Sequence, residues 1–529
     1  MLLDWQMESS ESQVVAHPQG ESEITTVGAP ELRDSEPLVI ETEGGRYHVQ
    51  WDESAPATPY GQLVFFAQFL KAGGLFSRLC VGAPFAFQSN NAPQIVDVLG
   101  TLLLSILAGH SRYAHISALR FDQVSAPILG MSKVISEDSA RRSLQKLEQL
   151  GARSWQQREL RAVWEPLLYE PWVLDIDTTI KTIYGRQEGA EVGYNPHKPG
   201  RPSHTYHTYW IGRLRLCLDV EVRPGKEHAG KYGMPGLWEL IDSLGREAWP
   251  QFIRGDCNYG NEENMKQAEA RGLGYLFKLR QTKKAKELIR FLETQDRWSP
   301  AGSGWEVIEG MLQLSGWSRK RRVVVVRRTK TPRDSASSNS SAKGLPLLEL
   351  AGACTLESAT YEYIVLVTSL PYEAASIGQL YRERADTENP FDELKNQWGW
   401  AGFTTRDFER CQIMARFIAL VYNWWSLFVR LVDRKRHREA VTSRPMLLGG
   451  VARQTRHAGQ NRLHLNLSHG RADKIKEKLT KASQFLRAIL SAAEQLSLAE
   501  RWRRILAKIF EKYLDGRPLN GPLPTLASG

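Results

Sequence analysis

Paired cysteines are missing from this chain, and their absence removes two classes of protein. The five cysteines, Cys80, Cys217, Cys257, Cys354 and Cys411, lie far apart and form no CxxC pair. This spacing supports neither a disulfide framework nor a zinc ribbon. A reducing cytoplasm fits such a chain best.

Long apolar runs are missing as well. The nearest, residues 413–432, contains Arg416 and Arg430, which leave an uncharged interval of thirteen residues between them. That interval is too short to cross a bilayer, so we expect a buried helix there and no membrane partner. Residues 1–20 hold three acids and no basic segment followed by an apolar core, so we expect no signal peptide.

Basic residues are scarce only at the beginning of the chain. The net charge is +10, yet residues 1–45 hold ten acids and a single base, Arg33. Removing the −9 of that segment leaves +19 on the remainder. An acidic tail followed by a strongly basic body predicts a polyanionic partner, nucleic acid in particular.

Changes in residue pattern predict several domains, as a chain of 529 residues suggests. Residues 1–58 are interpreted as an acidic tail and a short β-hairpin around Gly44-Gly45. Residues 59–165 are interpreted as a helical DNA-binding domain. In it Ser136 predicts the N-cap of a basic helix over residues 137–150, which offers Arg141, Arg142 and Lys146 as candidate DNA contacts. Short basic helices after a turn are also common without such a role.

Residues 166–280 change to a β-rich pattern. The order is strand, strand, strand, helix, strand, helix, strand, beginning with WVLDIDTTI and ending with YLFKLR; the second strand is predicted as TYWIGRLRL, residues 208–216. Acids lie on the first and fourth strands, at Asp177 and Asp256. This order describes an RNase H-like mixed sheet, the first part of a catalytic domain.

Three further regions follow, which makes the fold class mixed α/β. Residues 281–372 are predicted to be a β-rich insertion with a mobile Ser-rich loop at 329–345. Residues 373–432 are predicted to complete the catalytic domain. Residues 433–529 are predicted to be a helical, basic C-terminal region.

The segment YRERADTENPFDELK, residues 381–395, combines charges of both signs. On one continuous helix Tyr381, Arg384, Glu388 and Lys395 share a face, which suits a carboxylate metal ligand beside cations that grip a phosphodiester. A solvated helix with charge pairs is the plain alternative. Pro390 complicates the helix, because Asn389 is able to cap a new one that would place Glu388 at a break.

Asp177, Asp256 and Glu388 together supply three carboxylates, the oxygen ligands that Mg²⁺ prefers. Such a set is able to hold two Mg²⁺ ions, with Mn²⁺ as a substitute, for phosphodiester chemistry without a side-chain nucleophile. Asp175 lies two residues before Asp177 on the same strand face and is the alternative first ligand. His204 and His207 are disfavoured as metal ligands, because no further His or Cys lies near them in sequence.

These motifs resemble one known family. The spacing of Tyr381, Arg384, Glu388 and Lys395 is similar to the YREK signature of a group of bacterial insertion-sequence DDE transposases. DIDTT around Asp177 and RGDCNYGNE around Asp256 resemble the first and second acidic motifs of that group. Asp177 is preferred to Asp175 because hydroxyl residues follow it, as in the family. The resemblance covers roughly residues 60–430.

The resemblance implies a cut-and-paste transposase that binds double-stranded DNA, both terminal inverted repeats and target, as a homodimer in a synaptic complex. Asp177, Asp256 and Glu388 would hold two metal ions, and Tyr381, Arg384 and Lys395 the phosphate backbone. It further implies a location at the bacterial nucleoid. Relatives that form a DNA hairpin stack a tryptophan on a flipped base, and the candidates are Trp298, Trp305, Trp317 and Trp398.

Two alternatives remain open. One is an RNase H-like nuclease or resolvase that cuts DNA without joining it. The other is a catalytically silent DNA-binding protein derived from a transposase, against which the intact acids argue.

Overall fold

The computed structural model describes residues 38–49, 55–147, 149–196, 198–295, 297–330, 361–434, 437–466 and 470–521. The chain divides into two compact units, Met1–Ser54 and Ala55–Gly529. In the first unit β1 (Leu38–Thr42) and β2 (Gly45–Val49) pair antiparallel around Gly44-Gly45, where the hairpin was predicted. The acidic tail, residues 1–37, lies outside the described residues.

The second unit begins with helices, as the apolar spacing predicts. They are α1 (Leu63–Gly73), α2 (Leu75–Val81), α3 (Ile95–Leu107), α4 (Ser125–Ile128), α5 (Glu137–Leu144) and α6 (Gln149–Trp164). Ser136 caps α5 as expected, since its Oγ accepts a hydrogen bond from the Ser139 N–H at 3.2 Å. The predicted helix over 137–150 is wrong in its length, because α5 ends at Leu144 and Lys146 lies beyond it in a turn.

A mixed sheet follows, and its element order agrees with the prediction. The strands are β4 (Val173–Thr182), β5 (Glu191–Val192), β6 (Pro202–Ile211), β7 (Leu216–Pro224), β8 (Phe252–Gly255) and β9 (Gly274–Lys278), with helices α7 (Ala229–Asp242) and α8 (Glu262–Ala270) between them. β6 lies antiparallel between β4 and β7, whereas β4, β8 and β9 are parallel neighbours. The expected mixed α/β, RNase H-like class is confirmed.

The second long strand of this sheet starts and ends earlier than predicted. The sequence analysis placed one strand over residues 208–216, but β6 ends at Ile211 and β7 starts at Leu216. The connection between them is a tight turn in which Arg213 and Arg215 have positive φ, 62° and 52°. Pro202–His207, which precede the predicted strand, belong to β6 and are mostly buried.

The predicted insertion extends the same sheet. It contains α9 (Lys283–Glu293), β10 (Ser299–Pro300), β11 (Trp305–Leu312), β12 (Arg321–Thr329) and β13 (Tyr361–Thr368). Because β13 pairs antiparallel with β9, the sheet reaches ten strands in the order β10-β11-β12-β13-β9-β8-β4-β6-β5, with β7 on β6. Most of the predicted mobile loop, residues 331–345, lies outside the described residues.

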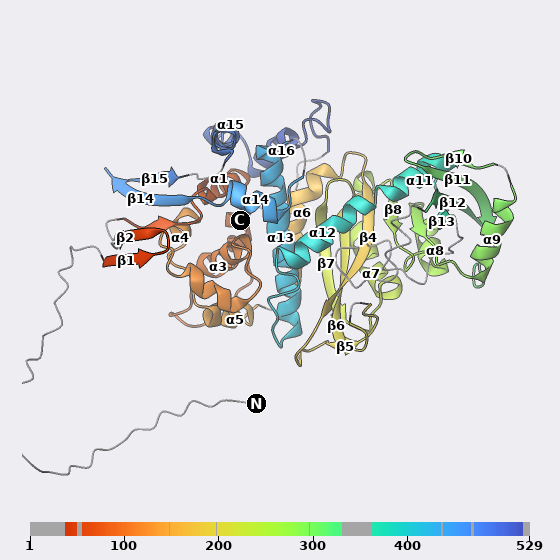
Figure 1. Ribbon diagram of the computed structural model, residues 1–529, viewed down its shortest axis with the longest axis horizontal. Coiled ribbons are helices and arrows are strands. Elements are labelled where there is room, and N and C mark those ends of the chain that lie inside the picture. The colour runs from red at the N-terminus through yellow and green to blue at the C-terminus, as the bar shows by residue number, and fades with distance from the viewer. Residues whose placement is uncertain are drawn as a thin grey trace, which may run out of the picture. The chain divides into compact units, whose positions relative to one another are not determined.

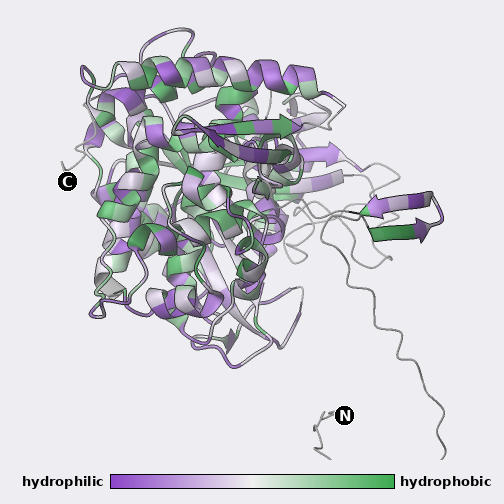
Figure 2. Cartoon of the chain, turned by 90° about the vertical axis from the view of Figure 1, so that its left-hand side faces the viewer, coloured by the Kyte–Doolittle hydropathy of each residue, from purple (hydrophilic) through white to green (hydrophobic). Residues whose placement is uncertain are grey.

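The chain then returns to helices: α11 (Ala374–Arg382), α12 (Ala385–Asn396), α13 (Phe408–Val432), α14 (Ala440–Leu447), α15 (Ala472–Ser491) and α16 (Leu498–Ile509). Figure 1 shows α13 between the N-terminal helices and the sheet, and its 25 residues pack on α1, α3, α6, α15, α16 and β7. Hydrophobic residues alternate with hydrophilic ones along the outer helices (Figure 2). The buried helix predicted at 413–432 is confirmed.

Membrane-spanning character is absent from the single helices of the described ranges, although α1 and α2, bent by 66° at their junction, together meet the length and composition of a span.

The C-terminal region, expected to be helical, is not helical throughout. It includes a β-hairpin, β14 (Val451–His457) and β15 (Gln460–Asn466), and β14 also pairs with β3 (Ala57–Thr58).

Candidate active site

Asp177 and Asp256 belong to neighbouring parallel strands. β4 and β8 pair in a register that sets Asp175 opposite Arg254, and the same offset sets Asp177 level with Asp256, the residue that directly follows β8. Adjacent strands lie about 4.8 Å apart. The two acidic residues that the sequence singled out therefore lie side by side on adjacent strands.

The charges of both carboxylates act on Tyr259. Its side chain is buried, and its hydroxyl lies 2.6 Å from the Thr178 Oγ1, beside Asp177. Burial raises the pKa of Tyr259 well above its ordinary value, and the negative charges of Asp256 and Asp177 raise it further. Sequence reasoning missed this tyrosine, although it lies three residues after the second acid.

Local hydrogen bonds orient each acid. The Asp177 Oδ1 accepts from the Thr178 N–H at 2.7 Å. The two Asp256 oxygens accept from the backbone N–H and the side-chain amide of Asn258, at 2.9 and 3.0 Å. These short-range bonds orient Asp177 within β4 and Asp256 directly after β8.

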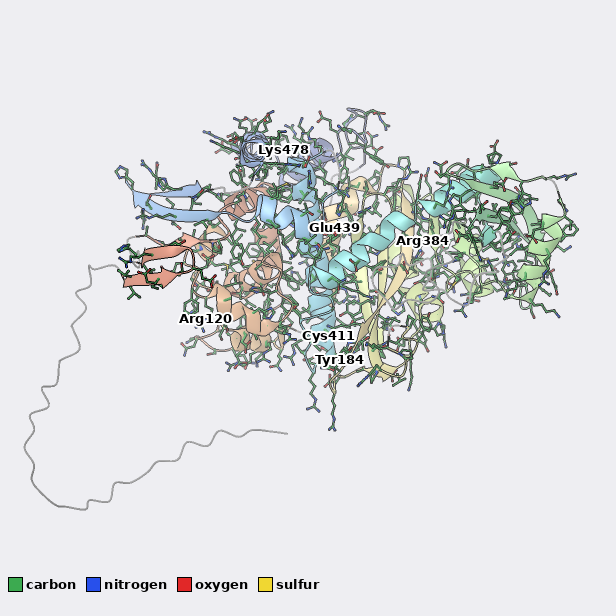
Figure 3. The ribbon with its side chains drawn as sticks, viewed as in Figure 1. Arg120, Tyr184, Arg384, Cys411, Glu439 and Lys478 are labelled. Carbon is green, nitrogen blue, oxygen red and sulfur yellow. The ribbon has the colours of Figure 1, made fainter. Side chains whose placement is uncertain are left out.

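Arg384 contacts the first acid directly. Its Nη2 donates to the Asp177 Oδ2 at 2.5 Å, and both side chains are buried. Figure 3 shows Arg384 in front of the sheet, where α11 gives way to α12. The salt bridge fixes this helix junction to β4.

The single helix assumed for residues 381–395 is wrong. α11 ends at Arg382, Arg384 occupies the N-cap position of α12, and Tyr381 therefore belongs to a different helix from Lys395. The break precedes Glu388 rather than following it, because α12 runs from Ala385 through Pro390 to Asn396. The alternative in which Asn389 caps a new helix is thus overturned. The side chain of Glu388 lies outside the described residues.

Lys395 approaches the same acid from the far end of α12. It is half-buried, and burial lowers its pKa while the negative charges of Asp392 and Asp177 partly oppose that shift. Since Arg384 at the start of α12 and Lys395 near its end both interact with Asp177, the helix crosses the acid. Tyr381 instead packs on a second apolar cluster built from the inserted strands.

Asp175, the alternative first ligand, is already engaged. Its two oxygens accept from Arg254 Nε and Nη2 at 2.5 and 2.7 Å, and both side chains are buried. Arg254 also donates to the backbone carbonyl of Leu380 on α11. This bidentate pair explains why an apolar strand carries a second acid, since an unpaired buried charge is costly.

Glu393 is a further buried acid of α12 that sequence reasoning overlooked. Its Oε1 accepts from the Trp398 Nε1–H at 3.0 Å and from the Ala440 N–H at 2.9 Å, and its Oε2 lies 3.1 Å from His437 Nε2. These contacts join α12 to α14 and give Glu393 a structural role. The spacing of the signature residues selects Glu388 on this helix and carries no signal for Glu393.

His204 and His207 are not brought together with other metal-ligand types. Both are buried on β6, and their Nε2 atoms lie 2.9 Å from the Glu188 carbonyl and 3.2 Å from the Glu227 carbonyl. Burial lowers the pKa of His207 to about 4. Among the described side chains, which do not include that of Glu388, no cluster of three or more His, Cys, Asp and Glu residues is arranged to hold a metal.

The four tryptophan candidates differ in burial. Trp398 is fully buried, and Trp305 and Trp317 are 9 % and 8 % exposed. Trp298 keeps more surface, although the Arg327 guanidinium stacks 3.8 Å from its ring centroid. Trp298 is the most exposed of the four side chains.

The candidate DNA contacts of the N-terminal helices lie at the surface. Arg142 and Lys146 are exposed, and Arg141 pairs with Asp138 of its own helix at 2.5 Å. None of the three makes a described contact with Asp177 or Asp256.

Three comparisons with known proteins complete the picture. Residues 87–486 match the sequence profile of a family described as Transposase DDE domain group 1. Among curated proteins no match is found. Among solved structures the chain is similar to the piggyBac transposase synaptic complex with hairpin DNA, at 13 % identity and a TM-score of 0.38, over 90 % of this chain and 89 % of that one.

Proposed function

The chain belongs to the transposase DDE domain family, and from that membership we propose that it binds terminal inverted repeats and catalyses cut-and-paste transposition. The two reactions are metal-dependent DNA strand cleavage and strand transfer. The observation that carries the proposal is the pair Asp177 and Asp256, level on neighbouring parallel strands and both acting on the buried Tyr259.

The donor chemistry fits a hard divalent cation. Asp177 and Asp256 present carboxylate oxygens side by side, the ligand type that Mg²⁺ and Mn²⁺ prefer. Glu388 lies on α12 between Arg384 and Lys395, which both interact with Asp177. The segment of α12 that carries Glu388 therefore passes near Asp177. We assign Asp177, Asp256 and Glu388 as the ligands of two ions. Bound there, such ions activate the attacking hydroxyl and stabilise the leaving oxygen.

The neighbouring cations suit the phosphate backbone. Arg384 pairs with Asp177, the charge of Asp177 acts on Lys395, and a guanidinium makes charge-assisted, bidentate contacts to phosphate oxygens. Arg384 donates a hydrogen bond to Asp177. When metal binds Asp177 and DNA enters the site, Arg384 would release this carboxylate and donate to a phosphate instead. Tyr381, at the end of α11, is the third phosphate contact in this proposal.

The finer assignments follow the signature in the sequence. The spacing of Tyr381, Arg384, Glu388 and Lys395 supports assigning the chain to the YREK group of bacterial insertion-sequence transposases. Such an enzyme would work on DNA at the nucleoid, as a homodimer that holds two repeat ends. In a hairpin-forming step Trp298 would stack the flipped base, and Arg141, Arg142 and Lys146 would contact DNA outside the active site.

A strand-transfer assay tests this function. The full chain is incubated with Mg²⁺, a target plasmid and a labelled, pre-cleaved duplex of the repeat that flanks its coding sequence. Joined product is expected. Nicking without joining would identify a nuclease or resolvase instead, and binding without either reaction would identify a silent DNA-binding protein.

A further inference from the structure

The hairpin β14–β15 is an acid-free, basic ribbon. From residue 440 to residue 472 the sequence contains no Asp or Glu, and the hairpin carries the basic residues Arg453, Arg456, His457, Arg462 and His464. The two strands pair over seven residues each, and Ala458 and Gly459 close the turn with positive φ of 48° and 75°. Such a two-residue turn continues the strand twist without a flexible loop.

The two faces of the hairpin differ in chemistry. Paired residues of antiparallel strands point to the same side, and the side alternates along each strand. One face, called the polar face, therefore carries Val451, Arg453, Thr455, His457, Gln460, Arg462, His464 and Asn466. The opposite face carries Ala452, Gln454, Arg456, Asn461, Leu463 and Leu465.

The base of the ribbon is fixed to the protein through the opposite face. Ala452 is buried and pairs with Thr58 of β3. A Cβ at Gly61 would lie only 2.6 Å from the Ala452 Cβ and 2.9 Å from Leu465 Cδ2, so the hairpin packs closely on the chain at Gly61. The polar face consequently points away from this anchor, and its residues other than Thr455 are exposed.

The geometry points to a duplex DNA-binding surface on the polar face of β14–β15, an inference that rests on the proposed function. Arginine, glutamine and asparagine are the side chains that make bidentate hydrogen bonds to base edges, and Arg453, Arg462, Gln460 and Asn466 supply them on one face. A two-stranded ribbon is narrow enough to enter a major groove about 12 Å wide. Figure 1 shows the ribbon extending from the helical region rather than being covered by it.

The positive charge of the polar face favours DNA over other binding partners. A polar face with two arginines, two histidines, no acid and one exposed apolar residue, Val451, is complementary to a polyanion and has little apolar area to bury against a protein partner. The structural alternative is that basic residues on an edge hairpin merely prevent strand-to-strand aggregation. The two roles predict different consequences for the same variant.

A binding experiment on the full chain separates them. The probe is a labelled duplex of about 40 base pairs with random sequence, in EDTA, and anisotropy is followed between 50 and 200 mM salt. We expect R453Q/R462Q to weaken binding about 10-fold or more and to lower the salt slope by nearly two. The matched control R456Q removes charge from the opposite face of the same hairpin and should stay within about twofold of wild type.

Normal affinity of R453Q/R462Q, or an equal loss in R456Q, would overturn the inference, and self-association of the double variant with normal affinity would identify the aggregation role. If the double variant fails to fold, a photoreactive residue at position 464 should crosslink to the duplex and one at position 454 should not. Failure of strand transfer with these binding differences intact would reject the proposed chemistry alone. Strand transfer with no binding difference would reject the ribbon alone.

Discussion

Arg254 on β8 donates two hydrogen bonds to Asp175 on β4, at 2.5 and 2.7 Å, and both side chains are buried. Breaking a buried pair by removing one partner costs about 3–5 kcal/mol. We therefore expect Asp175→Ala to lower the free energy of unfolding by that amount. A urea melt followed by tryptophan fluorescence measures it, and an unchanged midpoint would show that the pair contributes little.

Asp177, two residues away, should behave in the opposite way. The amide of Asp177→Asn keeps an acceptor for Arg384 but cannot supply a carboxylate ligand, and Asp256→Asn is equivalent on the next strand. We expect strand cleavage to fall more than about 100-fold in each variant, with DNA binding close to wild type. The melting temperature of Asp177→Asn should fall less than that of Asp175→Ala, because the hydrogen bond to the buried Arg384 is kept although its charge loses its partner. Cleavage at the wild-type rate in either variant would remove that residue from the metal site.

Arg384 competes with metal for Asp177, because its Nη2 lies 2.5 Å from Oδ2. We expect Arg384→Gln to bind Mn²⁺ about 10-fold more tightly without DNA, a difference of about 1.4 kcal/mol, and yet to cleave DNA more slowly. Calorimetric titration measures the affinity. Arg382→Gln is the matched control, since Arg382 donates to the Gly302 carbonyl at 2.8 Å instead. Weaker Mn²⁺ binding in Arg384→Gln would contradict the competition.

Glu393 should matter for stability rather than for metal. Glu393→Ala leaves the buried Trp398 and Ala440 N–H groups without their acceptor, which costs about 1–3 kcal/mol per group. Thermal melting should show a clear loss for this variant. Its exposed neighbour in Asp392→Ala should change stability by less than about 0.5 kcal/mol. Equal melting temperatures for the two variants would argue against the structural role.

Acid should weaken the attachment of α8 to the inserted strands. Burial by itself raises the pKa values of Glu262 and Glu269, but hydrogen bonds from Arg321 and its neighbours outweigh it and lower both to about 2. Because these folded-state values lie below the ordinary 4.5, the stabilisation is fully present above about pH 4.5 and is lost as the pH falls towards 2. Thermal melts from pH 6 to pH 3 should show this loss.

Arg321→Met provides the comparison for that measurement. Without the guanidinium the two carboxylates lose the partner that holds their pKa values down. The variant should be less stable than wild type at pH 6, and the difference should shrink towards pH 3. A constant difference across the range would mean that the ion pairs do not set the acid sensitivity.

The sequence determined the order of the elements and the positions of the acids. Strand and helix periods are local properties, so the series from β4 to β9 was readable from residues 173–278, and so was the N-cap at Ser136. The DIDTT and RGDCNYGNE motifs and the spacing of residues 381–395 indicated the family for the same reason, since each motif is a short, continuous stretch.

Tertiary structure decided the partners of those residues. Asp175 and Asp177 share one strand face, and the sequence preferred Asp177 only through its resemblance to a family motif. The tertiary structure gives them different partners, Arg254 from β8 for Asp175 and Arg384 from the α11–α12 junction for Asp177. The break before α12 occurs where Arg384 pairs with Asp177 on β4. The helical spacing of residues 381–395 does not predict this break. The hairpin β14–β15 has only four apolar strand residues, Val451, Ala452, Leu463 and Leu465, too few to mark both strands by apolar alternation. It forms because Ala452 meets Thr58, almost 400 residues earlier in the chain.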